Sequence, residues 1–115
     1  GRVPDMNVGD GSMNLGPLIK SLNCMYLIDC DDPDVSREIK SDVNKFINKY
    51  KFDMLMEVKD RGETVRIYTT GNEKTVTQFI MTASEESAFT FICLDGTMSR
   101  EELEKVIAKA AKEMD

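Results

Sequence analysis

Four strand-like segments follow one another between residues 52 and 95 and are joined by short polar turns. The first, at 52–59, alternates apolar and polar residues, which is typical of a strand buried on one face. The other three are 64–70, 76–83 and 88–94. Connections this short require each strand to run antiparallel to the one before it. This stretch therefore predicts a four-stranded antiparallel meander, with Gly62 placed to take a left-handed conformation in the first turn.

One helix is predicted before the meander and another after it. Asp32 is a natural N-cap and Pro33 suits the first position of a helix, whose apolar stripe runs to Tyr50. Ser99 and Glu102 have the spacing of a capping box before the last helix. Its predicted buried positions are Leu103, Val106, Ile107, Ala110 and Met114.

The segment before the first long helix carries one more predicted strand. Residues 24–28 form an unbroken apolar run inside 23–30, which indicates a central strand covered on both faces or nearly so. Upstream, apolar residues at helical spacing predict a short helix starting near Pro17. Residues 1–14 show no clean period and predict a flexible N-terminal tail.

These elements together predict a single α+β domain over residues 15–115 of the 115-residue chain. Their order is short helix, strand, helix, four-strand meander and helix. A five-stranded, mainly antiparallel sheet with the helices packed on one face would bury every apolar stripe in the chain. This arrangement is the predicted fold.

The composition excludes several classes of function. The chain has no histidine, so it holds neither a Ser-His-Asp triad nor a Cys–His nucleophile pair. A net charge of −6 argues against a nucleic-acid partner, because phosphate binding needs a basic surface. No uncharged apolar run approaches the roughly 20 residues of a membrane-spanning helix. We therefore expect no enzyme activity, no cofactor and no transmembrane segment.

Three cysteines occur at Cys24, Cys30 and Cys93. The odd number leaves at least one thiol without an internal partner. Cys24 and Cys30 lie about 20 Å apart along one predicted strand and cannot bridge each other. Either can pair with Cys93 only if their strands are neighbours in register, and otherwise all three are small buried hydrophobes.

One candidate ion site is the acidic turn formed by Asp29, Asp31, Asp32 and Asp34. Carboxylates this dense at a helix start could bind Ca²⁺, although the spacing of an EF-hand loop is missing. The structural interpretation needs only Asp32 as the N-cap and Asp34 beside the helix dipole. We favour the structural interpretation over a metal site.

A second candidate is the outer face of the predicted sheet, where Leu55, Arg66 and Tyr68 would form an exposed surface with Thr64 and Thr77. Tyrosine and arginine are frequent anchors of protein interfaces. The alternative is the ordinary solvated face of an antiparallel sheet. A partner protein is the hypothesis for this face.

The chain also resembles a known family. The helix ending in Tyr50-Lys51-Phe52 and the following Met54-Leu55-Met56-Glu57-Val58 strand carry the most specific part of the resemblance. Further matching stretches are 6–8, 14–16, 22–30 and 35–50. Together they resemble an uncharacterised family of small exported Bacteroidetes proteins, a domain of unknown function.

This resemblance implies an exported protein of the periplasm or outer envelope, secreted or lipid-anchored, with a signal peptide before the domain. It also implies a further strand before Arg2 and a role in envelope signalling, from neighbouring genes for extracytoplasmic sigma factors. The family implies no functional residues. We therefore expect a non-catalytic envelope module that binds a protein partner. The alternative is an envelope protein that binds a small molecule or Ca²⁺ at the acidic turn 29–34.

Overall fold

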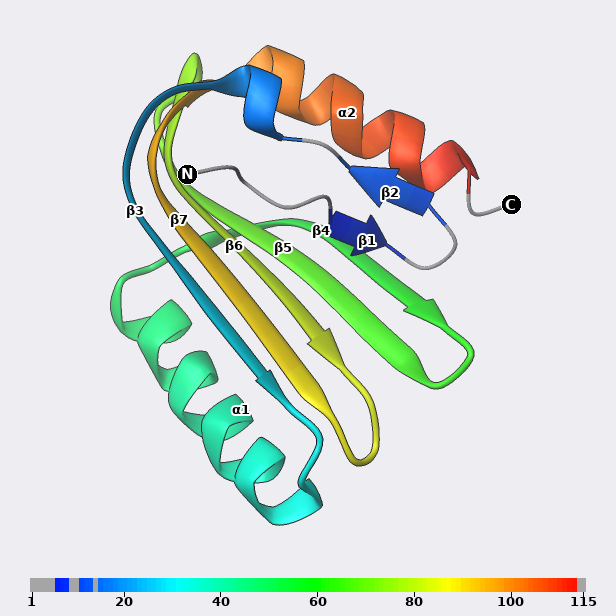
Figure 1. Ribbon diagram of the computed structural model, residues 1–115. Coiled ribbons are helices and arrows are strands. Elements are labelled where there is room, and N and C mark those ends of the chain that lie inside the picture. The colour runs from blue at the N-terminus through cyan, green and yellow to red at the C-terminus, as the bar shows by residue number, and fades with distance from the viewer. Residues whose placement is uncertain (1–5, 9–10, 14, 114–115) are drawn as a thin grey trace.

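The structure of the chain, a computed structural model, describes residues 6–8, 11–13 and 15–113 (Figure 1). The elements are β1 (Met6–Val8), β2 (Gly11–Met13), the 3-10 helix η1 (Gly16–Leu18), β3 (Ile19–Cys30), α1 (Pro33–Lys49), β4 (Asp53–Asp60), β5 (Glu63–Gly71), β6 (Thr75–Ser84), β7 (Phe89–Ser99) and α2 (Arg100–Glu113).

The main sheet has five strands in the order β3-β7-β6-β5-β4, and every neighbouring pair is antiparallel. This confirms the predicted α+β fold class, the meander and the order of elements. The first strand of the sheet pairs with the last one, from Ile19 opposite Met98 to Cys30 opposite Phe89. The two free edges of the sheet are therefore β3 and β4.

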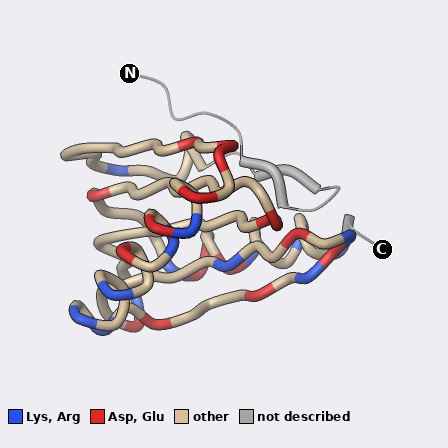
Figure 2. The backbone as a smooth tube through the Cα atoms, turned by 90° about the horizontal axis from the view of Figure 1, so that it is seen from below, with Lys and Arg blue, Asp and Glu red and all other residues tan. Residues whose placement is uncertain are grey.

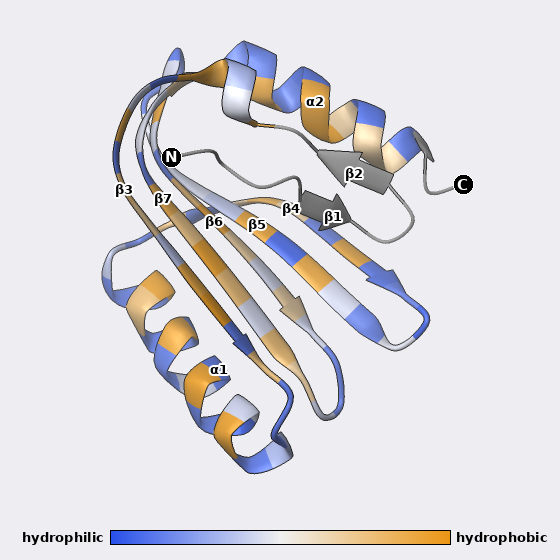
Figure 3. Cartoon of the chain, viewed as in Figure 1, coloured by the Kyte–Doolittle hydropathy of each residue, from blue (hydrophilic) through white to orange (hydrophobic). Residues whose placement is uncertain are grey.

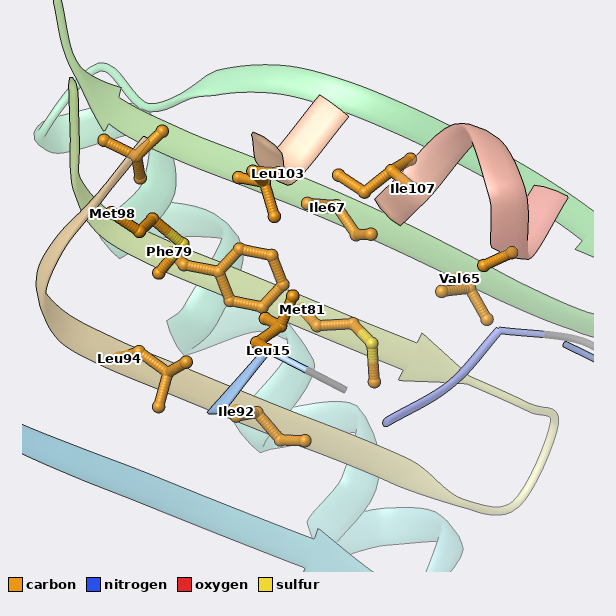
Figure 4. Packing of buried hydrophobic residues seen from close by; sticks show 12 residues of the cluster. Leu15, Val65, Ile67, Phe79, Met81, Ile92, Leu94, Met98, Leu103 and Ile107 are labelled. Carbon is orange, nitrogen blue, oxygen red and sulfur yellow. The ribbon is translucent and has the colours of Figure 1, made fainter. Parts of the chain in front are cut away.

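The two helices lie on opposite faces of the sheet, so the prediction that they share one face is wrong. Phe79 on β6 packs in the cluster that contains Leu103 of α2, whereas its neighbour Ile80 packs in the cluster with Val43 of α1. Figure 4 shows α2 in front of the sheet and α1 behind it. The physical reason is that β6 and β7 carry apolar side chains at successive positions, and both faces therefore need a cover.

The larger core lies between the sheet and α2. Its twelve buried residues are Leu15, Val65, Ile67, Val76, Phe79, Met81, Ile92, Leu94, Met98, Leu103, Ile107 and Ala110 (Figure 4). Leu15 has no exposed surface although it lies close to the N-terminal end of the domain. Leu103, Val106, Ile107 and Ala110 follow the predicted stripe of the last helix, and Met114 lies outside the described residues.

The N-terminal region differs from the sequence-based expectation. The predicted tail contains a small hairpin in which Met6 pairs with Met13, and β2 of this hairpin contacts α2. Residues 1–5, 9–10 and 14 lie outside the described residues. The predicted short helix is only the three-residue η1, because from Ile19 onward the backbone joins the ladder with β7. As a result β3 begins four residues earlier than predicted.

The caps and the first turn of the meander form as predicted. One carboxylate oxygen of Asp32 accepts hydrogen bonds from the backbone N–H groups of Asp34 and Val35, at 2.9 and 3.0 Å. Ser99 Oγ accepts the backbone N–H of Glu102 at 3.3 Å, which is the serine half of the predicted capping box. Gly62 has a φ of 83°, and the left-handed conformation closes the β4–β5 hairpin.

Candidate functional site

The strand β3 lies at a free edge of the sheet and is exposed along most of its length. This overturns the prediction of a covered central strand. Tyr26 is 62% exposed and Leu27 is 56% exposed. Their side chains point to opposite faces of the sheet, because successive residues of a strand alternate. The exposed large apolar residues of β3 are Leu22, Met25, Tyr26, Leu27 and Ile28, in the strongly hydrophobic part of the strand seen in Figure 3.

The two edges of the sheet differ in how they resist pairing with another chain. Edge strands are usually protected by charged residues, proline or a β-bulge. The β4 edge has a register shift between Met54 and Met56 and is charged at residues 53, 57, 59 and 60. The β3 edge has no charged residue and no proline from Ser21 to Ile28. β3 has register shifts of its own between Ile19 and Ser21 and between Leu22 and Cys24, but it pairs regularly with β7 from Cys24 onward. The stretch 24–28, which has no charge, no proline and no bulge, is therefore the least protected part of the two edges.

A groove of about 420 Å³ opens beside this edge, between α1 and strands β3 and β7. Its apolar wall consists of Tyr26, Ile28, Ile39, Val43, Phe46 and Phe91. Cys24, Cys93 and Gln78 complete the wall, with Asp42 and Asp95. The Phe46 ring also contacts Tyr50 and Phe52, at centroid distances of 4.9 and 5.7 Å. The groove and the β3 edge form one continuous apolar surface because both include Tyr26 and Ile28.

The three cysteines are free thiols, and two of them lie in the groove wall. Although β3 and β7 are neighbours, the residue opposite Cys93 is Tyr26, and Cys24 lies opposite Asp95. Burial raises the pKa of the Cys93 thiol to about 11, with smaller effects of Cys24 and Asp95. A thiol with such a pKa stays protonated at neutral pH, so Cys93 contributes apolar surface instead of a nucleophile.

The acidic turn is occupied by structural contacts. Asp32 caps α1, Asp29 Oδ1 accepts the hydroxyl of Thr90 at 3.0 Å, and Asp34 lies 3.7 Å from the Arg37 guanidinium. Asp31 is exposed. Within residues 6–8, 11–13 and 15–113, no group of three or more His, Cys, Asp or Glu side chains is arranged to hold a metal ion.

The predicted surface of Leu55, Arg66 and Tyr68 does not form. The bulge in β4 turns Leu55 toward the α2 side, where it packs against the larger core. Tyr68 is only 7% exposed and packs under α1. Arg66 Nε donates to Glu57 Oε2 at 2.6 Å, and this hydrogen bond lowers the pKa of the Glu57 carboxyl. The three residues therefore share no exposed face.

Two further features concern the distribution of charge and the length of the helices. Figure 2 shows basic and acidic residues interspersed along the chain, without a broad basic stripe. In the part of the chain that the structure describes, no helix is long and apolar enough to span a membrane.

The edge position of β3 could not be predicted from the sequence, because an uninterrupted apolar run is compatible with two positions in a sheet. Such a run is typical of a central strand, but an edge strand that binds another chain has the same composition. The position of β3 depends on its pairing with β7, which is some 60 residues away in sequence: Asp29, for example, lies opposite Thr90. No local pattern in residues 19–30 distinguishes a central strand from an edge strand.

Comparison with known proteins gives a family but no activity. A search of curated proteins found no match, and a search of solved structures found none either. The family model described as domain of unknown function DUF4252 matches residues 3–106, which include all five strands of the main sheet and the first half of α2. The chain therefore belongs to the DUF4252 family.

Proposed function

We propose that this protein is a non-catalytic module of the cell envelope that binds a protein partner through the free edge of β3. The observation that carries the proposal is the stretch 24–28 of the free β3 edge, which has no charge, proline or bulge and exposes apolar side chains on both faces of the strand. A long, uncharged edge strand is an aggregation hazard in a protein that leaves it unpaired. A partner that covers the edge removes this hazard and gives the exposed residues a role.

The chemistry of the edge favours an extended segment as the partner. Alternate residues of an edge strand present backbone N–H and C=O groups that have no partner within the sheet. A strand added next to β3 would satisfy these groups, as in other complexes that form by strand addition. Its side chains would lie beside Tyr26 and Ile28 on one face and beside Met25 and Leu27 on the other. The backbone would supply affinity, and the apolar side chains would supply selectivity.

The cellular part of the proposal rests on the family resemblance. We propose an exported Bacteroidetes protein, secreted or lipid-anchored in the periplasm or outer envelope, where its partner takes part in envelope signalling. The membership of the DUF4252 family supports the resemblance but carries no location or activity. The alternative of Ca²⁺ or small-molecule binding at the acidic turn gains no support, because Asp29, Asp32 and Asp34 already have structural contacts.

The test compares one substitution at each edge of the sheet. Leu27→Lys places a charge on the β3 edge, and Met54→Lys places the same charge on the β4 edge. The two positions are matched, because Leu27 is 56% exposed and Met54 is 53% exposed. Cells expressing the full-length protein are chemically crosslinked, and adducts in envelope and cytoplasmic fractions are quantified separately by mass spectrometry. Thermal unfolding of the purified variants checks that both remain folded.

We expect a discrete adduct in the envelope fraction that falls at least about tenfold with Leu27→Lys, equivalent to about 1.4 kcal/mol. Met54→Lys should leave the adduct unchanged. Equal adduct yields from both variants would overturn the assignment to β3. An adduct that contains only two copies of this chain would overturn the proposal of a separate protein partner. Adducts confined to the cytoplasmic fraction would overturn the envelope location.

A further inference from the structure

The groove beside α1 exists because one helix is too narrow to cover its face of a five-stranded sheet. A helix with side chains is about 10–12 Å across, and neighbouring strands are about 4.8 Å apart, so one helix covers roughly two strands. On α1, Val43 and Ile47 pack in one cluster with residues of β5, β6 and β7, and this cluster includes no residue of β3. The strip of the same face over β3 stays open, and Tyr26 is left exposed there.

The dimensions and walls of the groove suit a small molecule. A volume of about 420 Å³ lies within the range of about 300–1,000 Å³ that is typical of ligand sites. The rings of Tyr26, Phe46 and Phe91 come from three different elements, β3, α1 and β7, and line the same space. A flat or elongated apolar molecule would contact all three elements, and its apolar surface would be removed from water.

The charge in the groove has one sign only. Asp42 and Asp95 are the charged residues that line it. In the part of the chain that the structure describes, neither Asp42 nor Asp95 takes part in an ion pair or a side-chain hydrogen bond. The Cys93 thiol in the same wall is neutral at pH 7, because burial raises its pKa. A ligand therefore meets apolar surface and uncompensated negative charge.

We propose that this groove binds a small amphiphilic cation, a molecule with an apolar or aromatic body and one amine or quaternary ammonium group. The body packs against the aromatic and aliphatic wall, and the cation lies near Asp42 and Asp95. The faces of the lining rings stabilise a cation further. The two carboxylates and the net charge of −6 disfavour an anion of the same shape. This inference goes beyond the proposed function, since it requires no protein partner.

The test uses two probes with the same skeleton and opposite charge. The purified full chain is titrated with 4-phenylbutylamine and, separately, with 4-phenylbutyrate, and binding is followed by two-dimensional ¹H–¹⁵N NMR. We expect the amine to give saturable shifts centred on Tyr26, Phe46 and Asp95, with an affinity at least about tenfold higher than that of the carboxylate. Equal affinities, shifts centred elsewhere, or no saturable shift with the amine would overturn the proposal.

Variants test the two parts of the site separately. The double substitution Asp42→Asn and Asp95→Asn should reduce the preference for the amine to less than about twofold. Ile28→Trp should fill the groove and weaken both probes. Asp31→Asn, at an exposed carboxylate outside the groove, is the matched control and should change nothing. If the double variant does not fold, the ratio between the two probes on the unmodified protein still decides the question. Full retention of the preference in a folded double variant would overturn the role of the carboxylates.

Discussion

The edge position of β3 predicts different outcomes for two identical substitutions, Leu15→Ala and Leu27→Ala. Leu15 has no exposed surface and packs between the sheet and α2, whereas Leu27 is 56% exposed on the β3 edge. A central β3 would bury Leu27 as fully as Leu15. The two variants therefore separate the edge arrangement from the covered central strand that the sequence alone predicts.

The expected magnitudes follow from the burial of each side chain. Truncating a fully buried leucine to alanine removes about 2.4 kcal/mol of transfer free energy, at roughly 0.8 kcal/mol for each CH₂ group. The cavity left behind raises the cost for Leu15 to about 3–4 kcal/mol. A little less than half of Leu27 is covered, so its truncation should cost about 1 kcal/mol. The difference between the two variants is therefore about 2–3 kcal/mol.

Urea unfolding followed by circular dichroism measures both free energies of unfolding. At roughly 4 °C for each kcal/mol, Leu15→Ala should also lower the Tm by about 12–16 °C, and Leu27→Ala by about 4 °C. Equal losses for the two variants would refute the exposed edge. A loss below about 1 kcal/mol for Leu15→Ala would refute its place in the core.

Three further outcomes are expected. Asp32→Ala should lower the free energy of unfolding by about 1 kcal/mol in urea titrations, because α1 loses its N-cap; an unchanged midpoint would contradict the cap. At pH 8, iodoacetamide should label Cys24 and Cys30 well before Cys93, as measured by peptide mass spectrometry, and early labelling of Cys93 would contradict its raised pKa. Burial, with a hydrogen bond to Glu85, raises the pKa of Glu63, so the stability that this proton provides is present below the ordinary pKa of 4.5 and lost as pH rises through the folded-state pKa. Glu63→Gln should therefore raise the free energy of unfolding at pH 7 by less than about 1 kcal/mol, seen as a slightly higher Tm. At pH 4 the substitution should leave the Tm unchanged.

The meander could be predicted because its signals are local. Period-two alternation and short turns specify β4 to β7, and the turn at Gly62 needs only the sequence around it. The start of α1 was predictable for the same reason, since Asp32 and Pro33 act within one helical turn.

The faces and edges of the sheet depend on long-range packing. The consecutive apolar residues from Phe79 to Met81 are a sequence signal that both faces of β6 are covered, as the two clusters confirm. The outward position of β3 and the groove beside it had no such signal. Both follow from where α1 lies over the sheet, since Val43 and Ile47 pack in a cluster with residues of β5, β6 and β7 that includes no residue of β3.

The candidate residues on the sheet surface illustrate the same limit. Arg66 and Tyr68 do lie on one face, as strand alternation requires, but α1 covers Tyr68 on that face. Leu55 changes face because of a bulge, which no alternation rule anticipates. The proposed binding surface is therefore the β3 edge and not the middle of the meander.

The central claim, that a protein partner covers the β3 edge, is tested most directly by a photo-crosslinking amino acid placed in the living cell. The cross-linker replaces Leu27 in one strain and Met54 in another, so that each edge of the sheet is probed by the same chemistry. The account predicts a discrete adduct with one other protein at position 27 and none at position 54. No adduct at position 27, or the same adducts at both positions with equal expression, would contradict it.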